Sequence, residues 1–230
     1  MDMTTLVILL IVLGVFLLVF VRYCLQANVV DWGHGWINFL DGFLRLFIRT
    51  YHRFQFQAIP LPEKGGALLA SNHVSGLDPL LMIAACDRPV RFLIAQEQYD
   101  RFGFNWVFKQ AGCIPVERGG PASKPFRAAL QALAEGEVVG LFPEGGIHTR
   151  RKPAQRLKAG VAKLSAMSGV PIYPVTISGI LLEGFTVLTL FLPNRSCLTS
   201  YPPLVCDESD HHQCMAALTE LLINTDNNKK

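Results

Sequence analysis

The sequence Ser71-Asn72-His73-Val74-Ser75-Gly76-Leu77-Asp78-Pro79 separates two apolar runs. The run before it, residues 67–70, follows two glycines and is typical of a buried strand. The run after it, residues 80–85, is typical of a helix. Asp78 followed by Pro79 indicates the start of that helix, because Asp is a favoured N-cap and Pro suits the first helical position. The sequence therefore places His73 on a loop between a strand and a helix.

His73 and Asp78 can form a catalytic pair on this loop. In a continuous helix, residues five apart point about 140° away from each other. A bend in the loop can instead bring the imidazole onto the carboxylate, so that one ring nitrogen donates to Asp78 and the other is free to accept a proton. The alternative is a loop histidine beside an ordinary helix cap, and the pair alone leaves both interpretations open.

The composition favours one α/β domain with a short appendage. The chain has 230 residues, 50% of them hydrophobic, and a formal net charge of +3. No dense basic tract alternates with aromatic residues, which argues against a nucleic-acid partner. The cysteines show neither C-x-x-C spacing nor a Cys/His metal pattern, so we predict no metal and reduced thiols in a cytoplasm-facing protein. These cysteines are Cys24, Cys86, Cys113, Cys197, Cys206 and Cys214.

Residues 1–56 are expected to anchor the chain to a phospholipid membrane. Residues 3–21 are uncharged, and as a helix they would span about 28 Å, close to the hydrocarbon thickness of a bilayer. A helix buried in a core is the alternative, whereas the acidic start and the missing cleavage site argue against a signal peptide. The nearest positive charges all follow this segment, which predicts a main domain on the cytoplasmic side of a cell inner membrane. They are Arg22, Arg45, Arg49 and Arg53.

Residues 31–54 show a second helical pattern, with an aromatic face and a polar face. The polar face comprises Asn38, Asp41, Arg45, Arg49 and His52. Such a helix is suited to the headgroup region of a membrane. The same periodicity also fits a helix that packs on the core of a soluble domain.

Residues 57–223 alternate between strand-like and helix-like segments. Strands are expected at 89–95, 112–116, 138–142, 172–178, 187–192 and 196–202, and helices at 96–110, 124–135, 157–168 and 215–223. The alternation predicts an α/β fold, a mostly parallel sheet covered by helices on both faces. The polar tail, residues 224–230, is expected to be disordered.

Polar residues follow several of these strands. Glu117 and Arg118 follow one strand, Glu144 and Gly145 another, and Thr176 and Ser178 close a third less clearly. Sites in open α/β sheets form at the carboxyl ends of strands. An arginine there can bind two phosphate oxygens, and glycine N–H groups can approach an anion. Each group also has a structural interpretation: a surface ion pair for Arg118, and a tight turn for the glycines.

The chain resembles the glycerolipid acyltransferase family typified by 1-acyl-sn-glycerol-3-phosphate acyltransferase (lysophosphatidic acid acyltransferase). The resemblance covers residues 65–179. Four motifs carry it, in the family's order: N-H-x-S-x-x-D at 72–78, G-x-I-P-V-x-R at 112–118, F-P-E-G at 142–145 and V-P-I-x-P-V at 170–175. It implies an α/β fold with a membrane-anchoring helical part. It also implies acyl transfer to a lysophospholipid hydroxyl from an acyl-CoA or acyl carrier protein thioester, with no cofactor, metal or covalent acyl-enzyme.

The resemblance assigns roles to individual residues. His73 would be the base that activates the acceptor hydroxyl, and Asp78 would orient it and stabilise the imidazolium. Substrate binding falls to Asn72, Ser75, Arg118, Glu144, Gly145 and Gly146, with Arg118 on the phosphate of the acceptor. Glu144 would accept from a substrate hydroxyl or hold its loop.

The third motif departs from the family. Where the family has Thr-Arg, this chain has Gly146 and Ile147, so an anion-binding arginine is missing. His148 and the cations that follow can replace it, or the acceptor is a different lysolipid or hydroxylated lipid. The candidate anion-binding residues among those cations are Arg150, Arg151 and Lys158. Two further alternatives are a lipid hydrolase with Ser75 as nucleophile and a non-catalytic membrane-binding protein.

Overall fold

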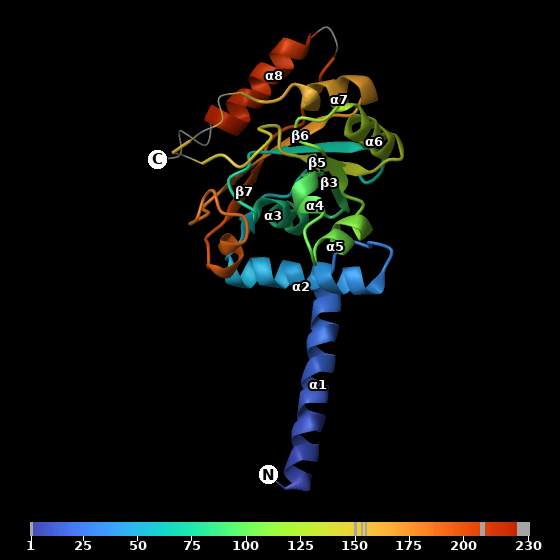
Figure 1. The fold of residues 1–230 in the computed structure, drawn as a ribbon, viewed down its shortest axis with the longest axis vertical. Coiled ribbons are helices and arrows are strands. Elements are labelled where there is room, and N and C mark those ends of the chain that lie inside the picture. The colour runs from blue at the N-terminus through green and yellow to red at the C-terminus, as the bar shows by residue number, and fades with distance from the viewer. Residues whose placement is uncertain (1, 150, 153, 155, 208–209, 225–230) are drawn as a thin grey trace.

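The structure is a computed structural model that describes all residues except 1, 150, 153, 155, 208–209 and 225–230. Helix α1 (Met3–Ala27) projects from the rest of the chain as a single rod. Helix α2 (Gly35–Tyr51) lies across its end, and an α/β domain lies on the other side of α2 (Figure 1).

Helix α1 is long and apolar enough to cross a membrane, and its apolar window is not buried against the domain. The alternative of a core helix is therefore wrong. Asp2 caps the helix, accepting a hydrogen bond from the N–H of Thr5 at 3.0 Å. The helix continues six residues beyond the predicted segment, and near its end it crosses α2. At the crossing, a Cβ on Gly42 would collide with the carbonyl of Cys24, so only glycine permits this contact.

Helix α2 turns part of its polar face toward the protein. Both sequence interpretations leave that face exposed, yet Asp41, Arg45 and His52 are buried. The apolar face is divided: Phe43 and Tyr51 are exposed, whereas Ile48 is buried in the core. The prediction that the polar face is exposed is therefore wrong for Asp41, Arg45 and His52, which have partners inside the protein, and holds for Arg49.

Asp41 and Arg45 form the centre of that buried contact. The Arg45 Nε donates to Asp41 Oδ2 at 2.6 Å. The same guanidinium donates to the carbonyls of Ala84 and Cys86, at 3.2 and 2.8 Å. These carbonyls lie at the end of helix α3 (Asp78–Ala85), whose first residue is the predicted catalytic aspartate. Arg45 thereby docks α2 onto the helix of the candidate site.

Replacing Arg45 with methionine should destabilise the fold by about 3–5 kcal/mol, because the buried Asp41 carboxylate loses its cation. The free energy of unfolding in urea, measured on the full chain in detergent, tests this. Arg49→Met is the matched control: Arg49 is exposed, and its main contact is with the ring of Phe56, 5.9 Å from the guanidinium carbon. That contact is worth about 1 kcal/mol or less at an exposed site. Equal losses in the two variants would contradict the prediction.

Seven strands form the sheet, in the order β1-β7-β6-β2-β5-β3-β4. Strands β6, β2, β5, β3 and β4 are parallel, whereas β7 is antiparallel to β6. The strands are β1 (Gln55–Phe56), β2 (Ala67–Ser71), β3 (Val90–Ala95), β4 (Ile114–Val116), β5 (Val138–Leu141), β6 (Ile172–Ser178) and β7 (Cys197–Ser200). The prediction of a mostly parallel sheet is confirmed. Its five parallel strands bring their carboxyl ends to one edge.

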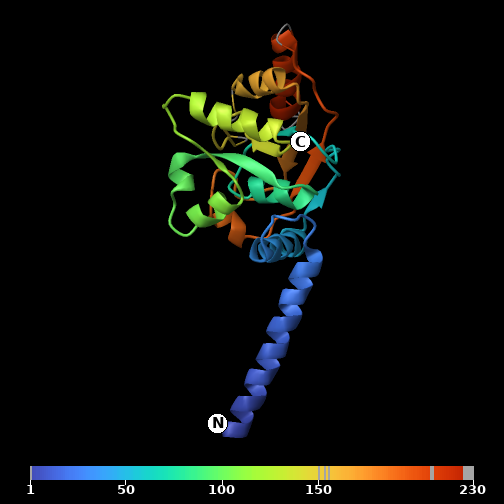
Figure 2. The ribbon, with the colours of Figure 1, turned by 90° about the vertical axis from the view of Figure 1, so that its right-hand side faces the viewer.

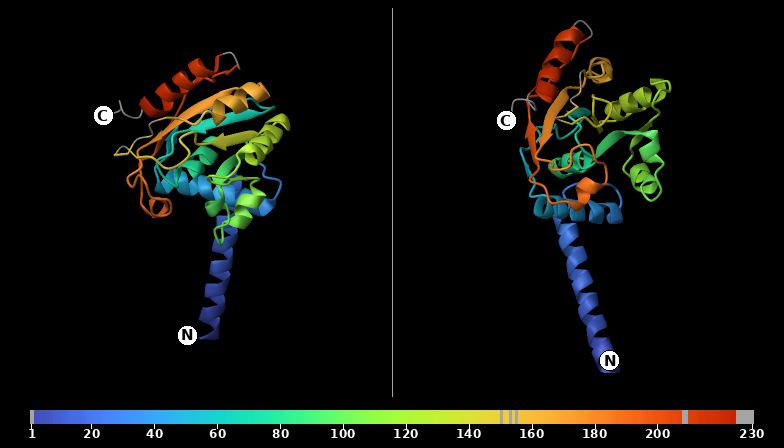
Figure 3. Two further views of the ribbon diagram at one scale, coloured as in Figure 1. Left: turned by 45° about the horizontal axis from the view of Figure 1, so that its top comes forward. Right: turned by 60° about the vertical axis from the view of Figure 1, so that its left-hand side comes forward.

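Helices cover both faces of this sheet. Helices α2 and α3 lie on one side, and α6 (Ser123–Ala134), α7 (Gly160–Ser168) and α8 (His211–Thr219) on the other (Figures 1 and 3). Strand β2 shows why. Its alternate residues Ala67 and Leu69 pack with α3, while Leu68 and Ala70 pack with the helices opposite. A strand apolar on both faces must be covered on both.

Several predicted elements differ in detail. The single helix expected at 96–110 is two short helices, α4 (Gln96–Tyr99) and α5 (Asn105–Gln110), because the chain turns at Gly103, where φ is +83°. The strand expected at 187–192 is a 3₁₀ helix, η1 (Leu188–Phe191). The final helix starts earlier than expected and continues as η3 (Glu220–Asn224), a π-helix. Of the predicted disordered tail, residues 224–230, Asn224 is the last residue of η3, and residues 225–230 lie outside the described residues.

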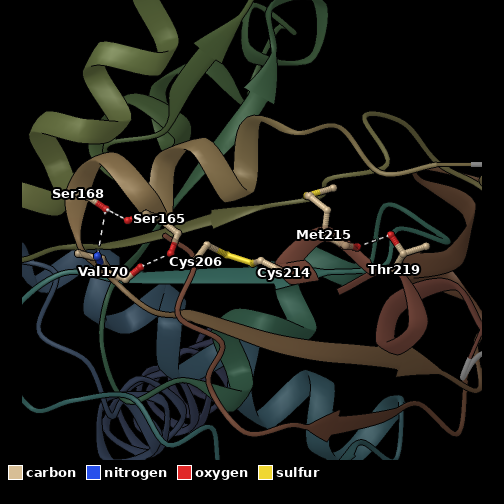
Figure 4. Close-up of a disulfide and its surroundings, with 7 residues drawn as sticks. All are labelled: Ser165, Ser168, Val170, Cys206, Cys214, Met215 and Thr219. Carbon is tan, nitrogen blue, oxygen red and sulfur yellow. Dashed lines mark hydrogen bonds between the residues drawn. A yellow bond between two sulfur atoms is a disulfide. The ribbon is translucent and has the colours of Figure 1, made fainter. Parts of the chain in front are cut away.

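The prediction that all the cysteines are reduced thiols is wrong for one pair. Cys206 and Cys214 form a disulfide, because the chain folds back after β7 and brings their Cα atoms to 5.6 Å (Figure 4). Cys86 and Cys113 are free, and burial raises the pKa of Cys86 to about 12 and that of Cys113 to about 11. The cysteine content therefore no longer supports a cytoplasm-facing domain, and the arginines that follow α1 remain the basis for that prediction.

Candidate active site

His73 lies on the loop between β2 and α3, beside the first residue of α3. Its Nδ1 is 2.8 Å from Oδ2 of Asp78. A carboxylate only accepts, so Nδ1 carries the proton and Nε2 presents a lone pair. Nε2 makes no hydrogen bond to any residue that the structure describes, and the His73 side chain is 17% exposed whereas that of Asp78 is fully buried. The Nε2 lone pair can therefore meet a substrate from the solvent side, while the negative charge of Asp78 is buried behind the imidazole.

Asp78 is held by its own loop. Its Oδ2 also accepts from the backbone N–H groups of Val74 and Ser75, at 2.7 and 2.9 Å. Its Oδ1 accepts from the hydroxyl of Ser75 at 2.8 Å. The bend needed to bring a histidine five residues back onto the aspartate is thus fixed by the carboxylate, which accepts from three successive residues.

Asn72 and Ser75 do not reach a substrate. Both are buried, and the Asn72 amide exchanges two hydrogen bonds with the backbone of Ile177 in β6, at 2.9 and 2.7 Å. The Ser75 hydroxyl is occupied by Asp78. The prediction that these two residues bind substrate is wrong: they position the loop. The buried hydroxyl also removes the basis for a hydrolase with Ser75 as nucleophile.

The turn after β5 braces His73. The ring of Phe142 stacks on the imidazole with the centroids 4.0 Å apart. Glu144 Oε2 accepts from the backbone N–H of His73 at 3.1 Å, and the backbone N–H of His148 donates to the His73 carbonyl at 2.7 Å. Two roles were predicted for Glu144: accepting from a substrate hydroxyl or holding its loop. The contact with His73 corresponds to the second role.

Gly145 and Gly146 differ in what they offer a substrate. Gly145 has φ +77°, and its N–H donates to the carbonyl of Phe142 at 3.0 Å, so this N–H is already used in the turn. The N–H of Gly146 makes no hydrogen bond within the described part of the chain, and the space beside its Cα is open. Gly146 is therefore the better candidate for a main-chain donor to an anion.

Lys158 lies over the same turn. Its backbone N–H donates to the carbonyl of Pro143 at 2.7 Å, and a Cβ added to Gly145 would collide with the Lys158 ammonium group. Arg151 is exposed in the tight turn between Thr149 and Lys152. Arg150 lies outside the described residues. Of the predicted cations that the structure describes, Lys158 is the one placed against the third motif.

Arg118 lies on the same edge of the sheet, but not against His73. It follows β4 and is exposed. Strand β4 is three positions from β2, which corresponds to about 14 Å at the usual strand spacing. Arg118 can therefore meet only a part of the acceptor remote from the reacting hydroxyl.

One contact of the loop was not predicted. The N–H of Gly184 donates to the carbonyl of Val74 at 2.8 Å, and the N–H of Gly76 donates to the carbonyl of Phe185 at 3.1 Å. A Cβ on Gly76 would collide with the backbone of Thr186, which explains the glycine in the motif. No local pattern signals this pairing, because the partners lie more than 100 residues apart.

The fold and this loop define an α/β protein with a histidine hydrogen-bonded to a buried aspartate at the carboxyl edge of its sheet. A sequence profile of the acyltransferase family matches residues 53–178. This is more than half of the chain, and the chain belongs to the acyltransferase family.

Curated relatives point to the same family. A 1-acyl-sn-glycerol-3-phosphate acyltransferase of Bacillus subtilis is 25% identical, over 52% of this chain and 59% of its own length. That of Borreliella burgdorferi is 30% identical, over 51% and 47%. An N-acylphosphatidylethanolamine synthase of Arabidopsis thaliana is 33% identical, over 48% and 42%. The chain thus spans about half the length of these relatives.

A solved structure shares the fold. The 1-acyl-sn-glycerophosphate acyltransferase PlsC of Thermotoga maritima superposes with a TM-score of 0.59, covering 91% of this chain and 94% of the other. At 18% identity, this likeness supports the α/β fold and carries no statement about substrate.

Proposed function

We propose that this protein is a membrane-bound O-acyltransferase that moves a fatty acyl chain from a thioester to 1-acyl-glycerol-3-phosphate, giving phosphatidic acid in phospholipid biosynthesis. The observation that carries the proposal is the His73–Asp78 pair, with its proton on Nδ1 and its Nε2 free. Membership of the acyltransferase family and the two bacterial relatives support the same activity.

His73 Nε2 takes the proton from the acceptor hydroxyl as the oxygen attacks the thioester carbonyl. Asp78 stabilises the imidazolium that forms. The Gly146 N–H is placed to donate to the developing oxyanion. Collapse of the tetrahedral intermediate breaks the carbon–sulfur bond, and the imidazolium returns its proton to the thiolate. The step needs neither a metal nor an acyl-enzyme, and the donor is acyl-CoA or an acyl carrier protein thioester.

The acceptor phosphate needs cations near the turn. Lys158 supplies one over Gly145, which compensates for Ile147 at the position of the family's arginine. Arg118, at the far side of the same edge, is left to contact a part of the acceptor remote from the reacting hydroxyl. A lysine contacts a phosphate as a point charge, whereas an arginine can form two parallel hydrogen bonds, so Lys158 is not equivalent to the arginine of the family motif.

Replacing Lys158 with methionine should raise the KM for lysophosphatidic acid by about tenfold or more, because a charge-assisted hydrogen bond is worth about 1.5–3 kcal/mol. The kcat should change less, since the catalytic pair is untouched. Lys163→Met is the control, because Lys163 is an exposed lysine on α7. Steady-state kinetics with varied acceptor at saturating donor measure both constants. An unchanged KM would exclude Lys158 as a phosphate anchor.

A second acceptor class is favoured by one observation in this chain and one in its relatives. Gly146 and Ile147 replace the Thr-Arg of the family motif, and one relative is named for transfer to phosphatidylethanolamine. The second candidate function is thus acyl transfer to a lipid with a larger headgroup, by the same His73 chemistry.

An acyl-transfer assay on the detergent-purified full chain separates these functions. Labelled acyl-CoA and acyl carrier protein donors are offered to lysophosphatidic acid, other lysophospholipids and phosphatidylethanolamine. Transfer to lysophosphatidic acid at the highest kcat/KM supports the first function. Preference for another acceptor keeps the chemistry and reassigns the substrate. No transfer with either donor would favour a non-catalytic membrane-binding role.

We further propose that α1 crosses a cell inner membrane and that the catalytic domain faces the cytoplasm. Its support is the length and apolarity of α1 and the positive charges on its C-terminal side: Arg22 near the end of the helix, and Arg49 and Arg53 beyond it. Protease added to intact spheroplasts should leave the domain uncut, while inside-out vesicles should expose it. The reverse pattern would overturn this orientation.

A further inference from the structure

Several large apolar side chains of the domain are exposed, and some of them, such as Met167 on α7, stand apart from the others. Apart from α1, a group of five comes from the segment between β6 and β7. We call this group the lip: Leu181, Phe185, Leu188, Phe191 and Leu192. Leu181 and Phe191 are 69% and 68% exposed. A cluster of this kind is unusual on a protein surface that faces only water.

The lip lies beside α2, at the end of the domain from which α1 leaves. The hydroxyl of Tyr51, the last residue of α2, donates to the carbonyl of Phe191 at 2.6 Å. Figures 1 and 2 both show the η1 segment, in orange, next to α2 and level with it. The lip therefore continues the exposed aromatic residues of α2, Phe43 and Tyr51, and the unburied α1 marks the side on which a bilayer would lie.

A second exposed group flanks α2 at its other end. Phe102 is 100% exposed, and Phe104 and Trp106 are also exposed. The indole of Trp106 stacks on that of Trp36 in α2, with the centroids 3.9 Å apart. Apolar side chains thus extend from both ends of α2, on the side of the molecule that carries α1.

Positive charge accompanies the lip. Arg53 and Arg195 are exposed and line a cavity of about 420 Å³ where α2 ends and β7 begins. Arg49, also exposed, lies in the last turn of α2. Apolar side chains bordered by arginines match the chemistry of an anionic membrane surface, which offers acyl chains below its charged headgroups.

The lip is also bound to the catalytic loop. Gly184 and Phe185 exchange backbone hydrogen bonds with Val74 and Gly76, the residues that follow His73. A segment that rests on a membrane at one side and on this loop at the other fixes the height of His73 above the lipid. Such a link suits an acceptor whose hydroxyl lies at headgroup level.

We propose that the lip inserts into the headgroup region of a phospholipid leaflet beside α2 and holds the His73 loop at the membrane surface. The occupant of this surface is the lipid bilayer, because the lip is continuous with α2 and the membrane-crossing α1. The proposal rests on the membrane location given under the proposed function.

Depth-dependent fluorescence quenching tests the insertion on the full chain. A polarity-sensitive fluorophore is attached to Leu181→Cys or Phe191→Cys, and the protein is reconstituted in phosphatidylethanolamine–phosphatidylglycerol vesicles. The quenchers are lipids with a spin label high in the acyl chain, and aqueous iodide. Met167→Cys, 59% exposed on α7 at the opposite end, is the matched control, and Val12→Cys in α1 marks the membrane. The unsubstituted chain corrects for labelling at Cys197.

The spin-labelled lipid should quench the two lip positions at least about twofold more than position 167, since an interfacial segment is buried about 5–10 Å. If the spin-labelled lipid quenches the fluorophore at Val12→Cys but iodide quenches it at the lip positions, the inference is overturned and the membrane anchor remains supported. Protection of the lip from both quenchers would indicate a protein partner, such as a second copy, and would also overturn it. No lipid quenching at Val12 or at the lip would overturn both the anchor and the inference.

The catalytic consequence has its own test. Phe191→Asp should lower transfer to an acceptor embedded in vesicles by about tenfold, because the side chain no longer gains from apolar burial. Met167→Asp should leave the rate unchanged, since α7 lies away from the membrane side. Transfer by Phe191→Asp at the wild-type rate would overturn the link between lip and site.

Discussion

Replacing His73 with alanine is expected to lower the kcat of acyl transfer by about a thousandfold or more, because a positioned general base contributes about 10²–10⁴. The neighbouring acids that the structure describes are already engaged. Asp78 is fully buried, and Glu144 accepts from the backbone of His73. The rate is measured with a labelled thioester donor and the best acceptor of the panel.

The fold should survive this substitution. His73 is partly exposed, and the carboxylate of Asp78 keeps its three hydrogen bonds from Val74 and Ser75. Thermal unfolding in detergent should therefore change little. His212→Ala, an exposed histidine at the start of α8, is the matched control and should retain full activity. A folded His73→Ala protein with undiminished turnover would exclude the mechanism.

The His73–Asp78 loop could be predicted from the sequence because the residues that form it and hold its shape are close together in the chain. An apolar strand, a polar loop and an Asp-Pro helix start are neighbours in the chain. The bend that joins His73 to Asp78 is fixed by donors from residues 74 and 75. Strand and helix alternation likewise predicted the parallel sheet, because a strand apolar on both faces must be covered on both.

The missed features depend on partners distant in the chain. Arg45 looks like a surface residue by periodicity, yet it is buried because the end of α3 offers it two carbonyls. Residues 187–192 are apolar and β-branched in part, but they lie at an exposed edge and form a 3₁₀ helix rather than a strand. Cys206 and Cys214 show no spacing motif, and only the return of the chain into α8 brings them together.

The structure was needed to assign a role to each residue of the motifs. Asn72 and Ser75 belong to the same short motif as the catalytic pair, and a motif does not say which members touch substrate. Burial separates them: Asn72 joins β2 to β6, and Ser75 binds the carboxylate. Conversely, Lys158 stood outside the matched motifs and lies over the third one, because the loop after β5 returns to Pro143.

Replacing Asp78 with asparagine should lower kcat by about 10³–10⁴, the loss that follows when the acid behind a catalytic histidine becomes neutral. An amide oxygen at the place of Oδ2 can still accept from the backbone of Val74 and Ser75. The Ser75 hydroxyl can rotate to accept from the new amide group. The loop is therefore expected to keep its shape while the imidazolium loses its counter-charge.

Ser75→Ala separates charge from geometry in this test. It removes one hydrogen bond to Asp78 and leaves the carboxylate in place, so its expected loss is about tenfold, in line with a single bond to a charged group. Comparing kcat for the two variants at equal thermal stability distinguishes the roles. If Asp78→Asn lost no more than Ser75→Ala, the aspartate would serve only to shape the loop, and His73 would act as a base without its negative charge.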